Sequence, residues 1–159
     1  MAETDFGPRS YAGMVFEPVG THDEIDLAYA AGFLDGEGCF CSYRSKSGWY
    51  VAVTCSNANK PSIEWLHKLL GGSMSKTTKK RKELHRPMHI WQVVGLDAVR
   101  VCKLLAPYLK QKLPQAILVL SIHQTAKWPK NSNRLTEETI HERIRLSTML
   151  RKEKHVSWN

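Results

Sequence analysis

The stretch A-A-G-F-L-D-G-E-G, from Ala30 to Gly38, decides the fold that the sequence predicts. It closes an apolar helix that we expect to begin at Thr21, where T-H-D-E forms a capping box with Glu24. The glycines at positions 36 and 38 are typical of a helix end. A helix therefore leads directly into the extended residues that follow.

Alternating and amphipathic segments continue after this helix in a regular order. Turn residues separate the two members of each strand pair. Asn59 or Ser62 is expected to open the second helix, Asp97 to cap the third and Thr136 to cap the last, while Pro114 suits the first turn of the fourth. The predicted strands are Cys39–Arg44, Trp49–Asn57, Ser73–Lys79 and Met88–Val94.

This order predicts an α+β fold with an αββαββα core, followed by C-terminal helices. Sequential hairpins with helices between them form a four-stranded, mainly antiparallel sheet with its helices on one face. We expect an N-terminal arm over residues 1–20, a core domain over 21–126 and a helical extension over 127–159.

Alternation along the strands predicts which side chains face the core. Val51, Val53 and Cys55 form one apolar set, and Trp91 and Val93 form another. The opposite face is then polar, with Tyr50, Ala52, Thr54, Ser56, Ile90, Gln92, Ser73, Ser75, Thr77 and Lys79 directed outward. Because the helices cover one face only, the polar face is left for solvent or a partner.

The chain of 159 residues carries 23 Lys and Arg against 15 Asp and Glu, a net charge of +8. Much of this excess lies between Lys76 and Arg86, where Glu83 is the single acid. A basic loop beside a polar sheet face favours nucleic acid, with lysines on phosphates and strand side chains on base edges. The alternative is a solvated hairpin tip that keeps a sheet edge soluble.

Composition excludes several other classes. No apolar run approaches the ~18 residues of a membrane span, so no membrane partner is expected. The four cysteines form neither a Cys-x-x-Cys pair nor a disulfide framework. The first residues lack an apolar signal segment, so an intracellular setting is the expectation.

Small residues line one side of the first helix. Ala28, Gly32 and Gly36 recur every four residues, with Ala31 nearly on the same face. Such a stripe lets a second helix approach closely. The alternative is that this helix packs tightly on its own sheet.

Two carboxylates, Asp35 and Glu37, flank Gly36 where this helix ends. A helix C-terminus already carries partial negative charge, which disfavours acids there. A hard divalent cation such as Mg²⁺ would resolve the conflict, since it accepts carboxylates and backbone carbonyls. The alternative is that Asp35 caps local backbone while Glu37 faces solvent.

The stretch 30–38 resembles the signature of the LAGLIDADG homing endonucleases, with Ala30 in place of the usual leucine. Further segments resemble the same family: S-N-A-N-K at 56–60, L-L-G-G at 69–72, W-Q-V-V at 91–94 and L-A-P-Y-L-K-Q-K at 105–112. The resemblance covers residues 25–125. It implies a saddle-shaped sheet and a site-specific, intron-encoded DNA endonuclease.

One motif copy implies a homodimer that cuts both strands of a long pseudo-palindromic double-stranded DNA site. The resemblance places Ala28, Ala31, Gly32, Asp35 and Gly36 at the dimer interface. Glu37 would ligate Mg²⁺, with the Gly36 carbonyl as a second ligand, and Mn²⁺ or Ca²⁺ would occupy the same site. Lys112 would stabilise the phosphate transition state, and Asn57 would contact solvent in the site.

The resemblance assigns base reading to the polar sheet face and phosphate contacts to the basic loop. The base-reading set is Tyr43, Ser45, Tyr50, Thr54, Ser75, Thr77, Lys79 and Gln92. The phosphate-holding set is Lys76, Lys80, Arg81 and Lys82. Gln92 suits adenine, and the hydroxyl side chains are permissive hydrogen-bonding groups.

Two other functions fit the same fold: a maturase that binds intron RNA, and a DNA-binding regulator without cleavage. The acid at Glu37 argues against the regulator, which has no need of it. The target sequence, and an organellar, bacterial or phage origin, stay open.

Overall fold

The computed structural model describes residues 23–45, 48–77, 87–125 and 136–156. The predicted arm at 1–20 and the centre of the basic loop lie outside the described residues. The elements are α1 (Glu24–Glu37), β1 (Gly38–Ser45), β2 (Gly48–Asn57), α2 (Lys60–Leu70), β3 (Ser73–Lys76), β4 (His89–Val94), α3 (Leu96–Leu105), α4 (Leu113–Gln124) and α5 (Glu137–Val156).

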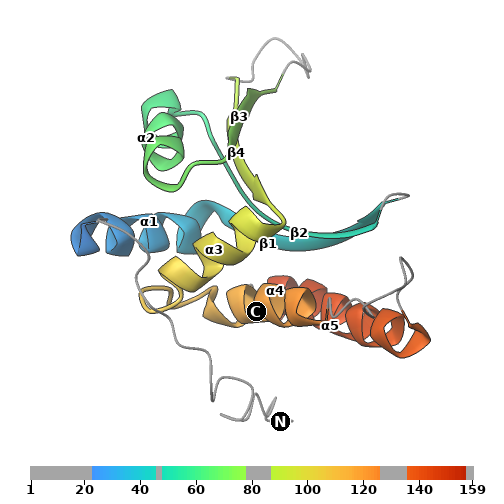
Figure 1. Cartoon of the computed structure of the whole chain (residues 1–159). Helices are drawn as coiled ribbons and strands as arrows, with labels where there is room; N and C mark the ends of the chain where they lie inside the picture. The colour runs from blue at the N-terminus through green and yellow to red at the C-terminus, as the bar shows by residue number, and fades with distance from the viewer. Residues whose placement is uncertain (1–22, 46–47, 78–86, 126–135, 157–159) are drawn as a thin grey trace.

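The four strands form one open antiparallel sheet in the order β1-β2-β4-β3. Helices α1, α2 and α3 gather on one side of it, and α4 and α5 lie side by side beneath the β1–β2 end (Figure 1). The predicted α+β class and αββαββα order are confirmed. Strand β3 ends at Lys76, earlier than the predicted Lys79.

The helix-facing side of the sheet forms the core. Phe40, Val53 and Trp91 are fully buried there, and they are joined by Leu27 and Leu34 of α1. The predicted inward set is confirmed. Ala52 was expected outward, yet it is fully buried. Its methyl group is short, and larger residues surround it: Cys41 and Val94 on the paired strands, and Tyr50 and Thr54 on its own.

Two predicted helix caps are wrong. The α1 cap is Asp23, whose Oδ1 accepts the N–H of Ile25 at 2.9 Å, because the helix begins at Glu24 rather than after Thr21. Helix α3 starts from Gly95, whose positive φ of 62° turns the chain out of β4, so Asp97 lies inside the first turn.

The other two caps are confirmed. Asn59 Oδ1 accepts from Ser62 N at 3.3 Å at the start of α2. Thr136 Oγ1 accepts from Thr139 N at 3.2 Å at the start of α5.

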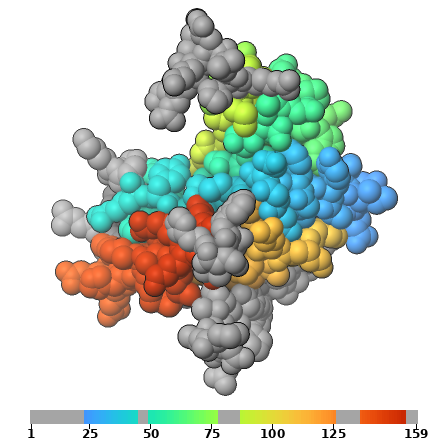
Figure 2. All heavy atoms as spheres, turned by 180° about the vertical axis from the view of Figure 1, so that it is seen from behind, coloured from blue at the N-terminus to red at the C-terminus, as the bar shows by residue number. Residues whose placement is uncertain are grey.

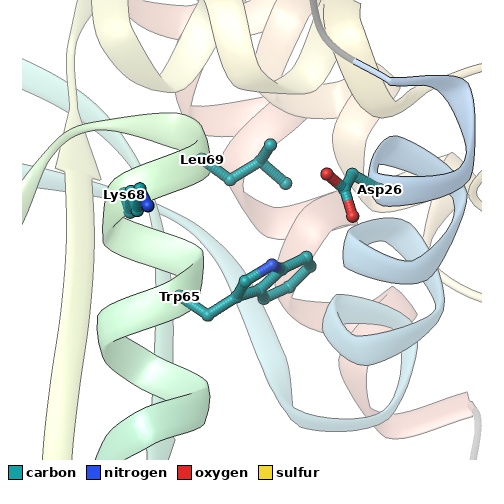
Figure 3. Close-up of a pocket in the computed structure, with 4 residues that line it drawn as sticks. All are labelled: Asp26, Trp65, Lys68 and Leu69. Carbon is teal, nitrogen blue, oxygen red and sulfur yellow. The ribbon is translucent and has the colours of Figure 1, made fainter.

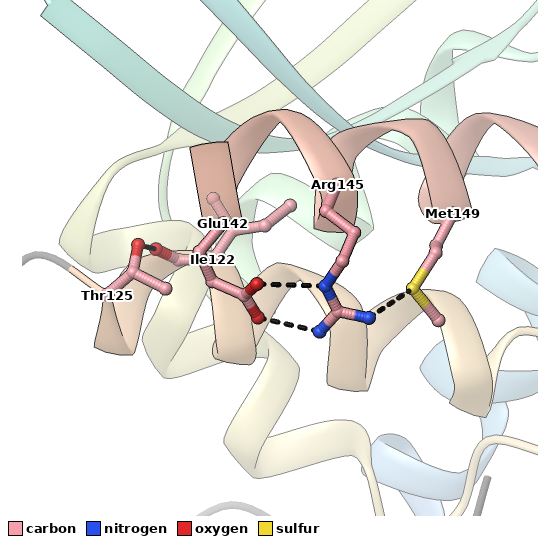
Figure 4. A network of polar contacts seen from close by, with 5 residues as sticks. All are labelled: Ile122, Thr125, Glu142, Arg145 and Met149. Atoms are coloured by element: carbon pink, nitrogen blue, oxygen red, sulfur yellow. Dashed lines mark hydrogen bonds and ion pairs between the residues drawn. The ribbon is translucent and has the colours of Figure 1, made fainter. Parts of the chain in front are cut away.

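Helix α5 packs on α4 and reaches the edge strand β1. Arg143 is buried, and its Nε donates to Thr125 Oγ1 at 2.8 Å. Ser147 Oγ accepts from Ser42 Oγ at 2.7 Å. On the outer side of α5, Arg145 pairs with Glu142 and donates to Met149 Sδ (Figure 4). These contacts hold α5 against the edge strand β1.

Within the part of the chain that the structure describes, no helix combines the length and the apolar character needed to cross a membrane.

Candidate active site and nucleic-acid interface

Helix α1 delivers Glu37 to the start of β1. The N–H of Gly38 donates to Leu34 O, and the chain then leaves the helix directly as strand. A Cβ at Gly38 would lie 2.6 Å from Leu34 O, so only glycine allows this tight exit. Glu37 is exposed. Within the described residues its carboxylate forms no hydrogen bond or ion pair, so it stays available to a ligand.

The ammonium group of Lys112 neutralises the end of α1. Its Nζ donates to the carbonyls of Leu34 at 3.0 Å, Gly36 at 3.2 Å and Gly38 at 2.7 Å. Burial lowers the pKa of Lys112, against the opposing effect of nearby acidic groups, Asp35 foremost. The partial negative charge at this helix end is therefore balanced by the chain's own ammonium group, where the sequence suggested a divalent metal ion.

Asp35 sets the position of Lys112. Its two carboxylate oxygens accept the backbone N–H groups of Lys110 at 2.7 Å and Lys112 at 2.8 Å. The turn between α3 and α4 is thus tied to α1 across more than seventy residues of sequence. Asp35 acts within its own chain, as a positioning group for Lys112.

Cys39, at the start of β1, adds a thiol to this cluster. Hydrogen bonding from Cys41, and then the charges of Lys154 and Lys112, lower the pKa of Cys39 to about 5. Lys154 Nζ lies 3.2 Å from Cys39 Sγ, which brings the end of α5 beside the site. Sequence reasoning missed Lys154, because no local pattern links it to a strand 115 residues earlier.

Asn57 has a local contact in this structure. Its Oδ1 accepts the N–H of Asn59 at 2.8 Å and closes the turn from β2 into α2. Among the contacts of the described residues, none joins Asn57 to Glu37 or Lys112.

The donors at the end of α1 are compatible with a hard divalent cation. Glu37 offers free carboxylate oxygens, and the Gly36 carbonyl has a second lone pair besides the one facing Lys112. The described residues contain no cluster of three or more His, Cys, Asp or Glu able to hold a metal. One chain therefore offers only part of the ligand set that Mg²⁺ requires, and waters and phosphate oxygens would complete it.

The register groups the predicted base-reading residues on the face away from the helices. Tyr43 pairs with Tyr50, and their rings stack at 5.5 Å. Thr54 pairs with Gln92, which pairs with Ser73, and Ser75 pairs with Ile90. We call this the open face. The register adds Cys39, Cys41 and Val94 to it, which continuing the two-residue alternation would have found.

Other predicted contact residues lie outside the open face. Thr77 Oγ1 bonds the backbone of Met88 beyond the end of β3. Lys76 is exposed at the end of β3, but it follows Met74 by two residues, so the alternation places it on the helix side of the sheet. Ser45 ends β1, but its side chain and residues Lys79, Lys80, Arg81 and Lys82 lie outside what the structure describes.

The small-residue stripe of α1 is exposed at Ala28, Gly32 and Gly36. A Cβ at Gly32 or Gly36 would meet no atom within 4 Å, so the described packing of the chain does not require either glycine. Figure 2 shows the blue surface of α1 uncovered beside the green α2. Ala31 is different: it is fully buried in the chain's own core, so a second copy cannot reach it, and its assignment to a dimer interface is wrong.

A shallow pocket of about 240 Å³ lies between α1 and α2, lined by Asp26, Trp65, Lys68 and Leu69 (Figure 3). Tyr29 packs edge-on against Trp65 at its margin, with ring centroids 5.0 Å apart. The lining combines two charged and two apolar side chains, and it contains neither Glu37 nor Lys112. This pocket is therefore separate from the candidate active site.

The fold of this chain is similar to that of one group of solved proteins. A four-stranded antiparallel sheet with its helices on one side is the single-domain architecture of the LAGLIDADG homing endonucleases. No protein-family model matches the chain, and no curated protein matches it. The similarity comes from solved structures.

One similar solved structure is the homing endonuclease I-CvuI, bound to the I-CreI target in 2 mM Mg with the DNA not cleaved. Its TM-score is 0.66 at 25% sequence identity, and the match covers 84% of this chain and 85% of that one. Archaeal intron-encoded I-Vdi141I, complexed with DNA, has a TM-score of 0.66 at 15% identity, covering 83% and 86%. Meganuclease I-AabMI, bound to uncleaved DNA, has a TM-score of 0.59 at 19% identity, covering 76% and 43%. This chain thus spans about half of I-AabMI.

Proposed function

We propose that the chain is a homodimeric, site-specific endonuclease that hydrolyses both strands of a long pseudo-palindromic DNA site with a divalent metal. The observation that carries the proposal is the exposed Glu37 beside Lys112, at the border of a polar open face. Structural neighbours solved with DNA support the same reading.

The chemistry at the end of α1 suits phosphodiester hydrolysis. Glu37 and the Gly36 carbonyl would hold the metal, which when bound acidifies the attacking water and steadies the leaving oxygen. Water oxygen bonds to phosphorus as the bond to the leaving sugar oxygen breaks. Lys112 places one positive charge where the phosphate gains negative charge. Asp35 holds Lys112 in this position through the backbone of residues 110–112.

Two observations favour a dimer. The exposed glycines Gly32 and Gly36 have open space above them, and each costs a helix roughly 1 kcal/mol relative to alanine. A second α1 against this stripe would explain both. The chain also spans about half of I-AabMI, so two copies match the length of that protein. A dimer with two-fold symmetry places one Glu37 on each strand of a pseudo-palindromic site.

Cleavage of a randomised double-stranded DNA library in Mg²⁺ tests the proposal. We expect one family of pseudo-palindromic sites to be cut, with Mn²⁺ supporting the same reaction. Glu37→Gln should lose nearly all cleavage and retain specific binding, because the exposed side chain keeps its shape and loses only its charge. If no sequence is cut at any metal concentration, the endonuclease proposal fails.

The same preparation separates the two alternative functions. A regulator would bind one DNA sequence without nicking it in any metal. A maturase would prefer structured RNA over duplex DNA. Sedimentation of the DNA complex tests the dimer, since one protomer per site would contradict it.

A further inference from the structure

Strand β4 presents three side chains in a line on the open face: Ile90, Gln92 and Val94. Their strand neighbours Trp91 and Val93 are buried in the core, which fixes the alternation. Ile90 and Gln92 are partly exposed, and Val94 is 37% exposed. The central polar group is therefore flanked at both ends by an apolar one.

The pattern extends across the sheet. Ile90 lies between Ser56 and Ser75, and Gln92 lies between Thr54 and Ser73. Each of these two rows contains hydroxyl groups from both neighbouring strands. In the row of Val94, the paired residue is the buried Ala52. Two branched aliphatic side chains thus stand beside hydroxyl and amide groups on this face, where contact with water is unfavourable for them.

The spacing of these residues matches that of stacked base pairs. Residues two apart on a strand are separated by roughly 6.8 Å, and base pairs rise by about 3.4 Å, so each step along this line of β4 spans about two base pairs. Ile90 is nearest to the cleavage centre, because its partner Ser56 directly follows Cys55, which pairs with Gly38. Val94 is the furthest.

Resting on the proposed function, we propose that Ile90 and Val94 each read the C5 methyl group of a thymine in the major groove. These two thymines lie about four base pairs apart in each half-site, and Gln92 reads an adenine between them. The thymine methyl is the apolar group that the major groove displays, and glutamine forms two hydrogen bonds with the N6 and N7 edge of adenine.

Duplex DNA is the occupant that the charge of the protein favours. The net charge of +8 and the run from Lys76 to Arg86 suit a polyanion laid along the open face. The solved neighbours with DNA have this same fold. A second protein copy would bring another excess of positive charge to the same surface.

Replacing thymine by deoxyuridine tests the proposal, since it removes the methyl group and keeps the base pairing. Sites are first selected for binding by the full chain without divalent metal, and each thymine is then replaced singly. We expect two positions per half-site, about four base pairs apart, at which the replacement weakens binding about threefold to tenfold. Replacement elsewhere should leave binding unchanged within a factor of two.

Variants assign each methyl group to its residue. Val94→Ser should remove the sensitivity at the outer position only, and Ile90→Ser at the inner position only. Ile144→Ser on α5 is the matched control, since Ile144 is 43% exposed on a helix that packs against α4 and β1. Deoxyuridine effects that persist unchanged in both β4 variants, or no deoxyuridine effect at all, overturn the proposal.

The outcomes also separate this proposal from the proposed function. Specific cleavage without any deoxyuridine effect refutes the methyl readout alone. Methyl-dependent binding without cleavage refutes the endonuclease and leaves the readout in place. Loss of dimer sedimentation in Val94→Ser or Ile90→Ser would show that a second copy covers these residues, and would overturn the readout.

Discussion

Lys112 combines two tasks at one atom. Its ammonium group satisfies three backbone carbonyls at the end of α1 and brings a positive charge next to Glu37. Because burial lowers the pKa of this lysine, its proton is held less firmly than that of a surface lysine. A structural and an electrostatic role therefore need to be separated by experiment.

Lys112→Met should slow single-turnover DNA cleavage by about two to three orders of magnitude, because the charge near the phosphate is lost. It should also lower the free energy of unfolding by about 1–3 kcal/mol, because the carbonyls lose a charged donor. Cleavage kinetics at saturating protein and denaturant unfolding measure the two effects.

Lys112→Arg is the control that keeps the charge. It should recover much of the cleavage rate if the charge matters. A folded Lys112→Met protein that cuts DNA at the wild-type rate would rule out the electrostatic role.

Helix α1 and its C-cap residue include two kinds of glycine. Gly38 is required by the chain itself, since an added Cβ would lie 2.6 Å from Leu34 O. Gly32 has open space above it, so the packing of the described residues does not require a glycine there. The two positions therefore respond differently to the same kind of substitution.

Gly32→Leu should dissociate the dimer and leave the fold of each chain intact, because a leucine blocks close approach of a second helix. At a protein concentration low enough for wild type to be monomeric as well, the thermal midpoint of the variant should equal or exceed that of wild type, since leucine favours helix over glycine by somewhat less than the roughly 1 kcal/mol that separates alanine from glycine. Analytical ultracentrifugation and thermal unfolding check both parts. Gly38→Ala should instead destabilise the fold, and a Gly32→Leu protein that stays dimeric would contradict the proposed interface.

Helix α5 contains an ion pair with a predictable pH dependence. The hydrogen bond from Arg145 lowers the pKa of Glu142, so the pair stabilises the fold above the unfolded pKa of about 4.3. This contribution is lost as the pH falls through the lowered folded value. Both side chains are partly exposed, so it amounts to at most about 0.5 kcal/mol. Glu142→Gln should cost that amount at pH 7 and progressively less as the pH is lowered below about 4.3, as urea unfolding over a series of pH values would reveal.

Local patterns predicted the elements, because two-residue and helical periodicities are properties of adjacent residues. The inward set Val51, Val53 and Cys55 follows directly from that alternation. The predicted caps of α1 and α3 are wrong. Thr21, Asp23 and Asp97 are all residue types that suit a helix cap, and the residue type alone does not say at which residue the helix begins. The bonds from Asp35 to residues 110–112, and the approach of Lys154 to Cys39, depend on tertiary packing and leave no local signal.

In the whole molecule, the two faces of the sheet have different surroundings. The helices bury the core on one side of the sheet, and the open face carries the hydroxyl, amide and aromatic side chains. The basic segment between Lys76 and Arg86 adjoins this face in the sequence, since it joins β3 to β4. Such a distribution suits a long polyanion lying across the sheet.

Neutralising Lys80, Arg81 and Lys82 together by alanine should weaken DNA binding similarly for all sequences. It should also reduce the magnitude of the slope of log binding constant against log salt by up to about 2.7 per protomer, or about 5.4 for a bound dimer, since each phosphate contact contributes roughly 0.9. Titrations over a range of salt concentrations give the slope. Lys68→Ala, on the helix side beside the α1–α2 pocket, should leave it unchanged, and an unaltered slope in the triple variant would exclude phosphate contacts from this loop.

The lysine at the end of α1 also makes folding independent of metal supply. Because Lys112 already occupies the carbonyls of Leu34, Gly36 and Gly38, the chain has no backbone group there that must wait for an ion. Chelators should therefore leave the melting temperature unchanged. Under the proposed function, a newly made protomer would therefore fold where free magnesium is scarce and would bind its ion only on meeting a phosphate backbone.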